Sequence, residues 1–356
     1  MDWNSGPRPR LRWLTDLWKG FGSWGLFLLL PSAIIFWCAT QEKSRSRQAE
    51  PVQAADEEST ADSLPIRAMS LSADGQYLDV IQSDALWSRH DAHSGQELGQ
   101  RSLPIANFTK IRIRSDGGVA VSIDHQDRLD LSANSTVLWQ GPLPEQSSGE
   151  SVQNCSLCQN RDLAAAISNE GALWVLAFDE SRIISCERYV FGVGLSSVAV
   201  SPSGDRIALV TVGRELWIWD TLLKQVALRS TADQAACLFA SWSGDGRRLI
   251  TYGYDRMLQV WHADSLELVQ RWRLDSQLAQ HAVLSFDGGL AAVADHELLS
   301  VREVDSGMIH AELTGHREQI TALQFTDQGR TLFSADTQGR IHRWSVPDQR
   351  SIWSTP

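Results

Sequence analysis

The sequence has few of the residue patterns that indicate metal binding or redox chemistry. Five cysteines occur in 356 residues, and they form only one C-x-x-C pair, Cys155 and Cys158. A zinc site would need a second pair or histidine partners at ligand spacing. Side chains three positions apart on a strand point to opposite faces, so we predict that both cysteines are structural.

Local motifs of the common enzyme classes are also missing. The sequence contains no glycine-rich phosphate loop, no G-x-S-x-G nucleophile elbow and no H-E-x-x-H zinc pair. Its nine histidines are scattered along the chain instead of being grouped. We therefore predict a protein that is not an enzyme and that has no cofactor, no metal and no evident small-molecule substrate.

Basic residues are the minority, and they are unevenly distributed. The chain has 32 basic and 43 acidic residues, for a formal net charge of −11. Residues 1–47 nevertheless carry seven basic and three acidic residues, which leaves 25 basic and 40 acidic residues for the remainder. An acidic body repels phosphate backbones, so we expect no nucleic-acid partner.

One long apolar run occurs, between Phe21 and Ala39, and it contains no charged residue. A helix of about 19 residues is long enough to cross a hydrocarbon core of roughly 30 Å. The aromatic and sulfur-containing residues Trp37 and Cys38 occupy positions where a signal peptidase requires small side chains. The sequence therefore predicts an uncleaved signal-anchor helix over residues 21–40, with a cleaved signal peptide as the alternative.

Basic residues flank this run, with four before it and three within about eight residues after it. The positive-inside rule then predicts that residues 1–20 lie in the cytoplasm. The rest of this single-pass membrane protein would lie on the other side. Residues 41–65 have little apolar content and no apolar period, so we predict a disordered stalk.

From residue 66 onward a short unit returns about every 42 residues. Each unit reads as an apolar strand, a tight turn and a second apolar strand, with turns at positions 75, 117, 161, 204, 246, 288 and 329. A period of 40–45 residues with short strands is typical of a β-propeller with one four-stranded blade per repeat. We predict an all-β, seven-bladed β-propeller over residues 66–354, in which the last repeat supplies its own outer strand near residues 349–353.

The repeats resemble those of the WD-repeat family. The dipeptide that names the family stands at Trp219-Asp220, and the same slot holds Trp261-His262 and Trp344-Ser345. The family's Gly-His pair occurs once, at Gly315-His316. The resemblance covers residues 66–354 and is most specific in the last four repeats. It implies a rigid platform whose loops bind other proteins.

The resemblance also implies a buried hydrogen-bond brace of His, Ser or Thr, Asp and Trp inside a blade. In the last repeat it maps onto His316, Ser334 and Trp344, with Gln338 in the Asp slot. We expect these residues to be structural, although His316 and Ser334 lie near Asp336 and could suggest a catalytic triad.

The fifth repeat supplies a second, incomplete brace. Thr251, Asp255 and Trp261 match the pattern, and the histidine is missing. On this alignment no blade carries the full set. Buried polar groups without partners cost about 1–3 kcal/mol each, so we expect apolar replacements in the other blades.

The longest predicted connection between repeats runs from residue 141 to 150, between the second and third blades. It contains Pro142 and Pro144, which stiffen it, and Glu145 and Glu150, which we expect to add to an acidic surface field. Long loops are often functional, although a tolerated insertion is the commoner explanation. We hypothesise a protein-docking rim here. We expect the loop to lie outside the core, so that shortening it leaves thermal stability nearly unchanged.

Two classes of function remain open. The first is a non-enzymatic, membrane-tethered WD-repeat scaffold that mediates protein–protein interaction with unidentified partner proteins. The alternative is a quinoprotein-like or other enzymatic propeller facing the exterior, because residues 91–98 somewhat resemble the turn of quinoprotein repeats. Such an enzyme needs converging polar ligands that the sequence does not display, so we favour the scaffold.

Overall fold

The structure, a computed structural model, describes residues 64–105, 108–134, 136–231, 237–274, 281–326 and 328–355. The chain divides into two units, residues 1–59 and 60–356. The predicted cytoplasmic segment, the apolar run at residues 21–40 and the stalk up to residue 63 lie outside the described residues. Across the described ranges the structure contains strands only, and no helix there is long and apolar enough to cross a membrane.

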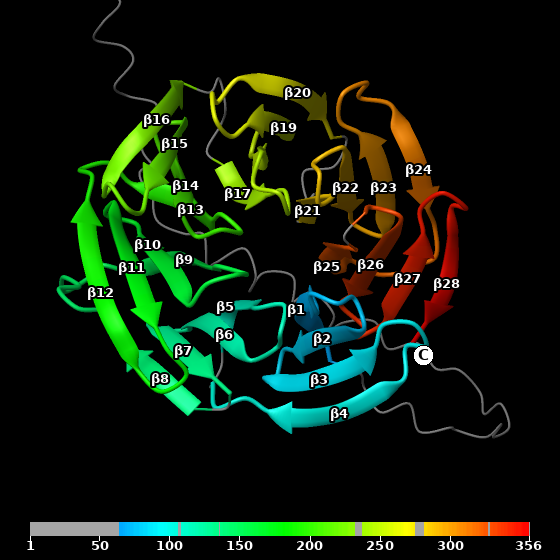
Figure 1. Ribbon diagram of the computed structural model, residues 1–356, viewed down its shortest axis with the longest axis horizontal. Coiled ribbons are helices and arrows are strands. Elements are labelled where there is room, and N and C mark those ends of the chain that lie inside the picture. Colours follow the sequence, from blue (N-terminus) through cyan, green and yellow to red (C-terminus); the bar gives the residue numbers. More distant parts are fainter. Residues whose placement is uncertain are drawn as a thin grey trace, which may run out of the picture. The chain divides into compact units, whose positions relative to one another are not determined.

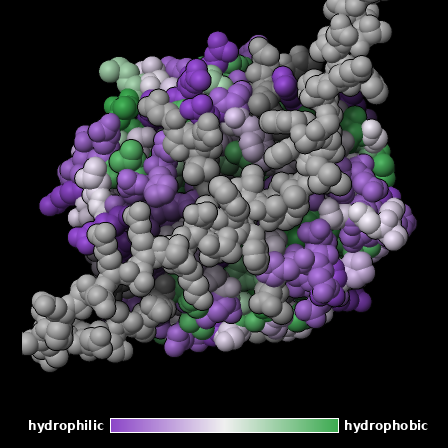
Figure 2. All heavy atoms as spheres, turned by 180° about the vertical axis from the view of Figure 1, so that it is seen from behind, coloured by the Kyte–Doolittle hydropathy of each residue, from purple (hydrophilic) through white to green (hydrophobic). Residues whose placement is uncertain are grey.

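The described residues from 64 onward form seven four-stranded sheets, each made of consecutive antiparallel strands. Figure 1 shows the sheets arranged as blades around a ring, with the first strand of each blade innermost. On the face shown in Figure 2, hydrophobic side chains are scattered among hydrophilic ones. The predicted all-β, seven-bladed β-propeller is confirmed.

The innermost strands are β1 (Ile66–Leu71), β5 (Phe108–Ile113), β9 (Val152–Leu157), β13 (Leu195–Val200), β17 (Cys237–Trp242), β21 (His281–Leu284) and β25 (Ile320–Phe325). The second strands are β2 (Tyr77–Gln82), β6 (Val119–Asp124), β10 (Leu163–Ser168), β14 (Arg206–Thr211), β18 (Arg248–Gly253), β22 (Leu290–Asp295) and β26 (Thr331–Asp336). The third strands are β3 (Leu86–Asp91), β7 (Leu129–Ala133), β11 (Ala172–Phe178), β15 (Glu215–Asp220), β19 (Met257–His262), β23 (Leu298–Glu303) and β27 (Ile341–Ser345). The outermost strands are β4 (Glu97–Ser102), β8 (Thr136–Gly141), β12 (Ile183–Val190), β16 (Gln225–Thr231), β20 (Leu268–Arg273), β24 (Ile309–Leu313) and β28 (Arg350–Ser354).

The turn between the first and second strands is held by a recurring set of local hydrogen bonds. In the fifth blade the hydroxyl of Ser243 donates to Asp245 at 2.7 Å and accepts from the backbone N–H of Arg248 at 3.0 Å. Gly246 has a φ of 70°, a left-handed conformation that favours glycine. The turns that mark the repeat in the sequence therefore lie where the chain reverses between the first and second strands of a blade.

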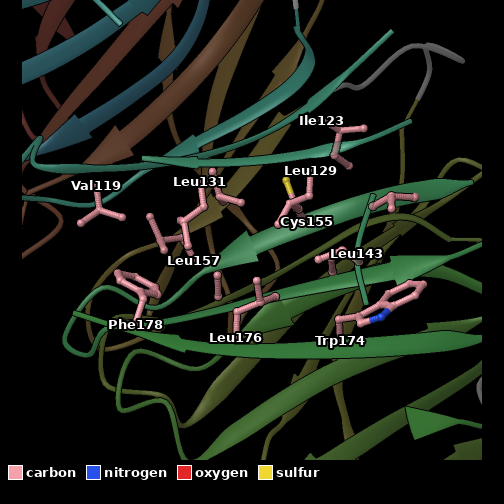
Figure 3. Packing of buried hydrophobic residues seen from close by; sticks show 14 of the residues in the cluster. Val119, Ile123, Leu129, Leu131, Leu143, Cys155, Leu157, Trp174, Leu176 and Phe178 are labelled. Carbon is pink, nitrogen blue, oxygen red and sulfur yellow. The ribbon is translucent and has the colours of Figure 1, made fainter. Parts of the chain in front are cut away.

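Hydrophobic residues fill the space between neighbouring blades. Figure 3 shows the cluster between the second and third blades, to which Leu131, Leu157 and Trp174 contribute. Cys155 packs in this cluster, whereas Cys158 packs in the cluster between the third and fourth blades. Both thiols are buried and free. The two cysteines thus serve opposite faces of one blade, as the strand alternation predicted.

The ring closes between the seventh and first blades. The outer strand β28 pairs with β27, so the last repeat supplies its own outer strand in the described part of the chain. Phe333 and Ala335 of β26 pack with Ile66 and Leu78 of the first blade. Ile66 begins the innermost strand of the first blade, so it does not add to the outer edge of the seventh blade.

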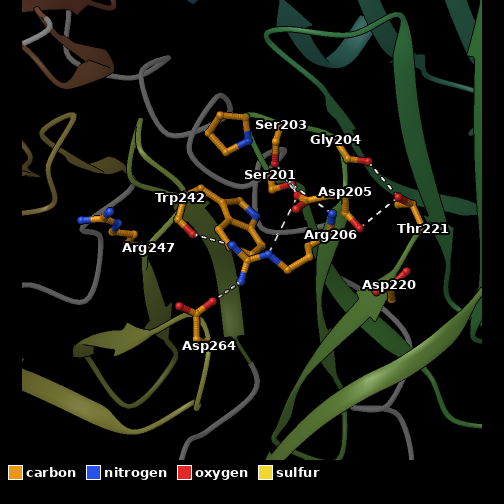
Figure 4. Close-up of polar contacts among 12 residues, drawn as sticks. Ser201, Ser203, Gly204, Asp205, Arg206, Asp220, Thr221, Trp242, Arg247 and Asp264 are labelled. Atoms are coloured by element: carbon orange, nitrogen blue, oxygen red, sulfur yellow. Dashed lines mark hydrogen bonds and ion pairs between the residues drawn. The ribbon is translucent and has the colours of Figure 1, made fainter. Parts of the chain in front are cut away.

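Arginine side chains link successive blades on the outer side of these turns. Arg206, the first residue of β14, donates to the carbonyl of Gly246 at 2.9 Å and to Asp264 at 2.7 Å in the next blade (Figure 4). Arg248, the first residue of β18, repeats the arrangement with Gly288 and Asp305. The first residue of the second strand is therefore an arginine that links to the next blade in both the fourth and the fifth blade.

Candidate functional site

The seventh blade contains a complete hydrogen-bond brace. Trp344 Nε1 donates to Ser334 Oγ at 2.7 Å, and the same oxygen lies 2.6 Å from His316 Nε2. His316 Nδ1 lies 2.9 Å from a carboxylate oxygen of Asp336. His316 comes from the loop before β25, Ser334 and Asp336 from β26, and Trp344 from β27.

The expectation that Gln338 fills the Asp slot is wrong, and so is the expectation that no blade carries the full set. Ser334 and Asp336 are two residues apart on one strand, so their side chains lie on the same face. Gln338 lies beyond the end of that strand, where its backbone N–H donates to Asp336 at 2.9 Å. The family pattern points to position 338, two residues beyond the acid that forms the bond.

The ionisation of Asp336 determines which atom of the brace donates and which accepts in each hydrogen bond. Burial alone would raise the pKa of Asp336, but the hydrogen bond from His316 and the backbone N–H groups of Arg340 and Gln338 lower it overall. An ionised carboxylate only accepts, so His316 Nδ1 donates to it. Ser334 then accepts from Trp344 and donates to His316 Nε2, which satisfies every polar atom between the indole and the acid.

Burial argues against a catalytic triad at this place. The side chains of His316 and Asp336 are 0% exposed, and Ser334 is also 0% exposed. Ser334 Oγ is engaged by both Trp344 and His316, which leaves a substrate no approach to the oxygen. The burial and mutual hydrogen bonds of these residues are those of an internal brace, and their stabilising role stays a prediction.

His342 adds a titratable group to the same core. Its ring stacks on Trp344 with centroids 4.9 Å apart, and it meets His316 edge-on at 4.3 Å. Neither ring nitrogen has a hydrogen-bond partner among the described residues. Burial, and then the proximity of His316, lower the pKa of His342 to about 4. The repeat pattern did not point to His342, because this residue does not occupy one of the four brace positions of the family.

In the fifth blade the predicted brace residues Trp261 and Thr251 are hydrogen-bonded to each other. Trp261 Nε1 donates to Thr251 Oγ1 at 2.9 Å, and both side chains are buried. Asp255 lies on the turn after β18, where it accepts from the backbone N–H of Met257 at 3.0 Å. The same Trp-to-hydroxyl bond therefore recurs here with threonine in place of serine.

The loop between the second and third blades is anchored in the core. Leu143 is 3% exposed and belongs to the cluster of Figure 3. Trp174 Nε1 donates to the carbonyl of Pro144 at 2.9 Å. The expectation that this loop lies outside the core is therefore wrong, and shortening it would remove buried contacts.

Glu150 is the hub of this loop. It accepts from Ser168 Oγ at 2.6 Å, from the backbone N–H of Ser147 at 3.0 Å and from Arg188 at 3.0 Å. Burial alone would raise the pKa of Glu150, but these hydrogen bonds and the charge of Arg188 lower it overall. With its side chain 0% exposed, Glu150 contributes no surface charge, contrary to expectation.

The remaining loop residues do form an exposed rim. Pro142 and Glu145 are exposed, and Pro144 is half-buried. The side chain of Gln146 accepts from the backbone N–H of Leu143 at 2.8 Å and donates to the carbonyl of Glu150 at 2.7 Å. These bonds join the two ends of the loop beneath its exposed tip.

No group of three or more His, Cys, Asp or Glu side chains in the described ranges is placed to hold a metal ion. Two polar clusters in the described ranges, the brace and the Glu150 hub, are internal. The surface loops around them are exposed.

Comparison with known proteins agrees with this architecture. Residues 307–345 match the family described as WD domain, G-beta repeat. WD repeat-containing protein 90 of Homo sapiens is 27% identical over 213 residues, covering 58% of this chain and 12% of that protein. The U3 small nucleolar RNA-associated protein 21 homolog of Schizosaccharomyces pombe is 30% identical over 102 residues, covering 28% of this chain and 11% of that protein. The chain thus spans about an eighth or less of the length of these relatives.

The fold also matches a solved propeller. The crystal structure of the Myceliophteria thermophila Cps50 (Swd1) β-propeller domain superposes with a TM-score of 0.65 at 17% identity, covering 80% of this chain and 96% of that one. At this identity the likeness concerns the fold alone. Residues 307–345 therefore resemble a WD repeat, and the chain shares the β-propeller fold of the solved structure.

Proposed function

We propose that the protein is a non-enzymatic scaffold that presents the loops of its propeller to partner proteins. The observation that carries the proposal is the contrast between its polar clusters and its loops. The His316–Ser334–Asp336 set is fully buried, whereas the rim at Pro142 and Glu145 is exposed and held in shape from below. A rigid scaffold with exposed loops suits protein recognition.

We further propose that the scaffold is tethered to a membrane through residues 21–40, with residues 1–20 in the cytoplasm and the propeller on the other side. The support is the uncharged run in the sequence and the basic residues before it. Protease added to sealed cells should cut the stalk at Lys43, Arg45 and Arg47. Protection until the cells are lysed would reverse the topology, and a soluble form lacking residues 1–40 would show a cleaved signal.

A nucleic-acid partner is not part of the proposal. One relative is named for association with a small nucleolar RNA. This chain has 25 basic against 35 acidic residues from residue 66 onward, which disfavours contact with a phosphate backbone.

The test of the docking rim is cross-linking in intact membranes followed by identification of the co-purifying protein. Glu145→Lys should reduce the recovered partner, because it reverses an exposed charge without touching the buried anchors. Glu180→Lys is the matched control, since Glu180 is exposed on a turn at the opposite ends of the strands. Equal recovery from wild type and Glu145→Lys would show that the loop is only an insertion.

A further inference from the structure

Three basic residues lie on inner strands of the ring, two in the second blade and one in the sixth. Lys110 of β5 pairs with Ile123, one residue before Asp124 at the end of β6. His281 of β21 pairs with Ala294, which likewise lies one residue before the end of its strand. Lys110 and His281 thus occupy the same layer of the ring, and Arg112 lies one layer further along the same face of β5.

The charge of Arg112 contributes to the pKa values of the other two basic residues. Burial, and then the charge of Arg112, lower the pKa of His281 to about 4, although the two residues belong to the second and sixth blades. Desolvation lowers the pKa of Lys110, and Arg112 lowers it further. Lys110 and Arg112 are both exposed to solvent.

Neither strong base has an acidic partner in the described part of the chain. Arg112 Nη1 donates to the carbonyl of Ile111 at 2.9 Å, and Lys110 Nζ donates to the carbonyl of Gln153. The carboxylate of Asp127 influences the pKa of Lys110 without forming an ion pair with it. A guanidinium has five N–H donors, so most of those on Arg112 remain available.

A cavity of about 190 Å³ lies beside Arg112. Its lining comes from the second to fifth blades, with Arg112 from the second and Ser241 from the fifth. Asn154, Ser156 and Ser197 add amide and hydroxyl groups to its lining. The cavity therefore combines an unpaired guanidinium with several neutral polar groups.

We propose that this cavity binds an oxyanion, a phosphate or carboxylate group, through Arg112. The planar guanidinium matches either group with two parallel hydrogen bonds, and the hydroxyl groups complete the oxyanion's shell. The source of the oxyanion is a free anion or the acidic side chain of a peptide segment that enters the ring. This site is independent of the docking rim, because it lies on the inner strands and not on the loop at residues 141–150.

The test uses the full-length protein in detergent and isothermal titration with two probes, inorganic phosphate and a glutamate-rich peptide, at constant ionic strength. Arg112→Gln should weaken binding at least about tenfold, and Arg112→Lys should weaken it less because the charge is kept. Arg182→Gln is the control, since that side chain is 77% exposed on an outer turn. Circular dichroism and thermal unfolding without ligand confirm that each variant is folded.

The outcomes separate the two sources and can overturn the site. Saturable phosphate binding that Arg112→Gln weakens identifies a free anion as sufficient. Peptide binding alone, weakened by the same variant, identifies an acidic segment as the source. Binding that Arg112→Gln leaves unchanged, or no saturable binding of either probe by wild type, would show that the cavity is not an oxyanion site.

Discussion

Trp344 and Ser334 are joined by a 2.7 Å hydrogen bond from the indole nitrogen to the hydroxyl, between β27 and β26 of the last blade. The serine passes the connection on to His316 at 2.6 Å, and through it to Asp336. One buried hydroxyl therefore satisfies both an indole and an imidazole. Removing it would leave two buried polar groups without partners.

Ser334→Ala should destabilise the propeller by about 2–4 kcal/mol, because each unsatisfied buried group costs about 1–3 kcal/mol. The measurement is the free energy of unfolding from denaturant titration. Ser354→Ala is the control, since Ser354 is exposed on β28 of the same blade and should change stability little. Similar free energies for the two variants would contradict a stabilising brace.

His342→Phe should remove part of the acid sensitivity of the fold. The folded pKa of His342 is about 4, below its ordinary 6.5, so the unfolded chain binds the extra proton between these values. Stability is therefore lost as pH falls from 6.5 towards 4, by on the order of 3 kcal/mol for this group. Phenylalanine keeps a ring against Trp344 and cannot titrate. Unfolding free energies measured from pH 7 to 4 should fall less steeply in the variant, and equal slopes would refute the assignment.

Glu150→Gln should destabilise the protein by about 2 kcal/mol at neutral pH, because Arg188 loses a buried carboxylate. The folded pKa of Glu150 is lowered, so its contribution is present above the ordinary value of 4.5 and is lost as pH falls through the folded pKa. The difference between wild type and variant should therefore shrink in acid. Glu145→Gln, on the exposed tip of the same loop, should leave thermal unfolding unchanged at either pH. A Glu150→Gln protein as stable as this control would mean that the hub is not stabilising.

Arg206→Ala should destabilise the boundary between the fourth and fifth blades by about 1–2 kcal/mol. Asp264 is 81% exposed, so this ion pair contributes little by itself. Most of the loss should come from the Gly246 carbonyl and from the Trp242 ring, which lies 5.2 Å from the guanidinium carbon. Arg247→Ala is the neighbouring control, because that side chain is 82% exposed. Hydrogen exchange at the Gly246 turn should accelerate only in Arg206→Ala, and equal exchange in both variants would contradict the link.

Much of the fold follows from local sequence. The seven turn positions recur at a nearly constant period. Gly246 and the equivalent glycines adopt a left-handed backbone conformation, and glycine at these positions indicates the turn in the sequence. Alternating apolar residues then assign one strand face to each interblade cluster, as Cys155 and Cys158 show. The family position of Trp261 and Thr251 also predicted their hydrogen bond, because it spans adjacent strands at fixed register.

The tertiary structure decided which distant groups meet. Asp336 rather than Gln338 completes the brace, because the loop that carries His316 lays its imidazole over the end of β26, 20 residues away in the chain. Glu150 is internal because Arg188, on β12 38 residues later, approaches from the far edge of the next blade. The charge of Arg112, in the second blade, affects the pKa of His281, in the sixth, only because the blades form one ring. The sequence period determines each blade, because its turns and its alternation of apolar residues are short-range features. The pairings between distant residues depend on how the blades pack around the ring, and no local sequence pattern contains that information.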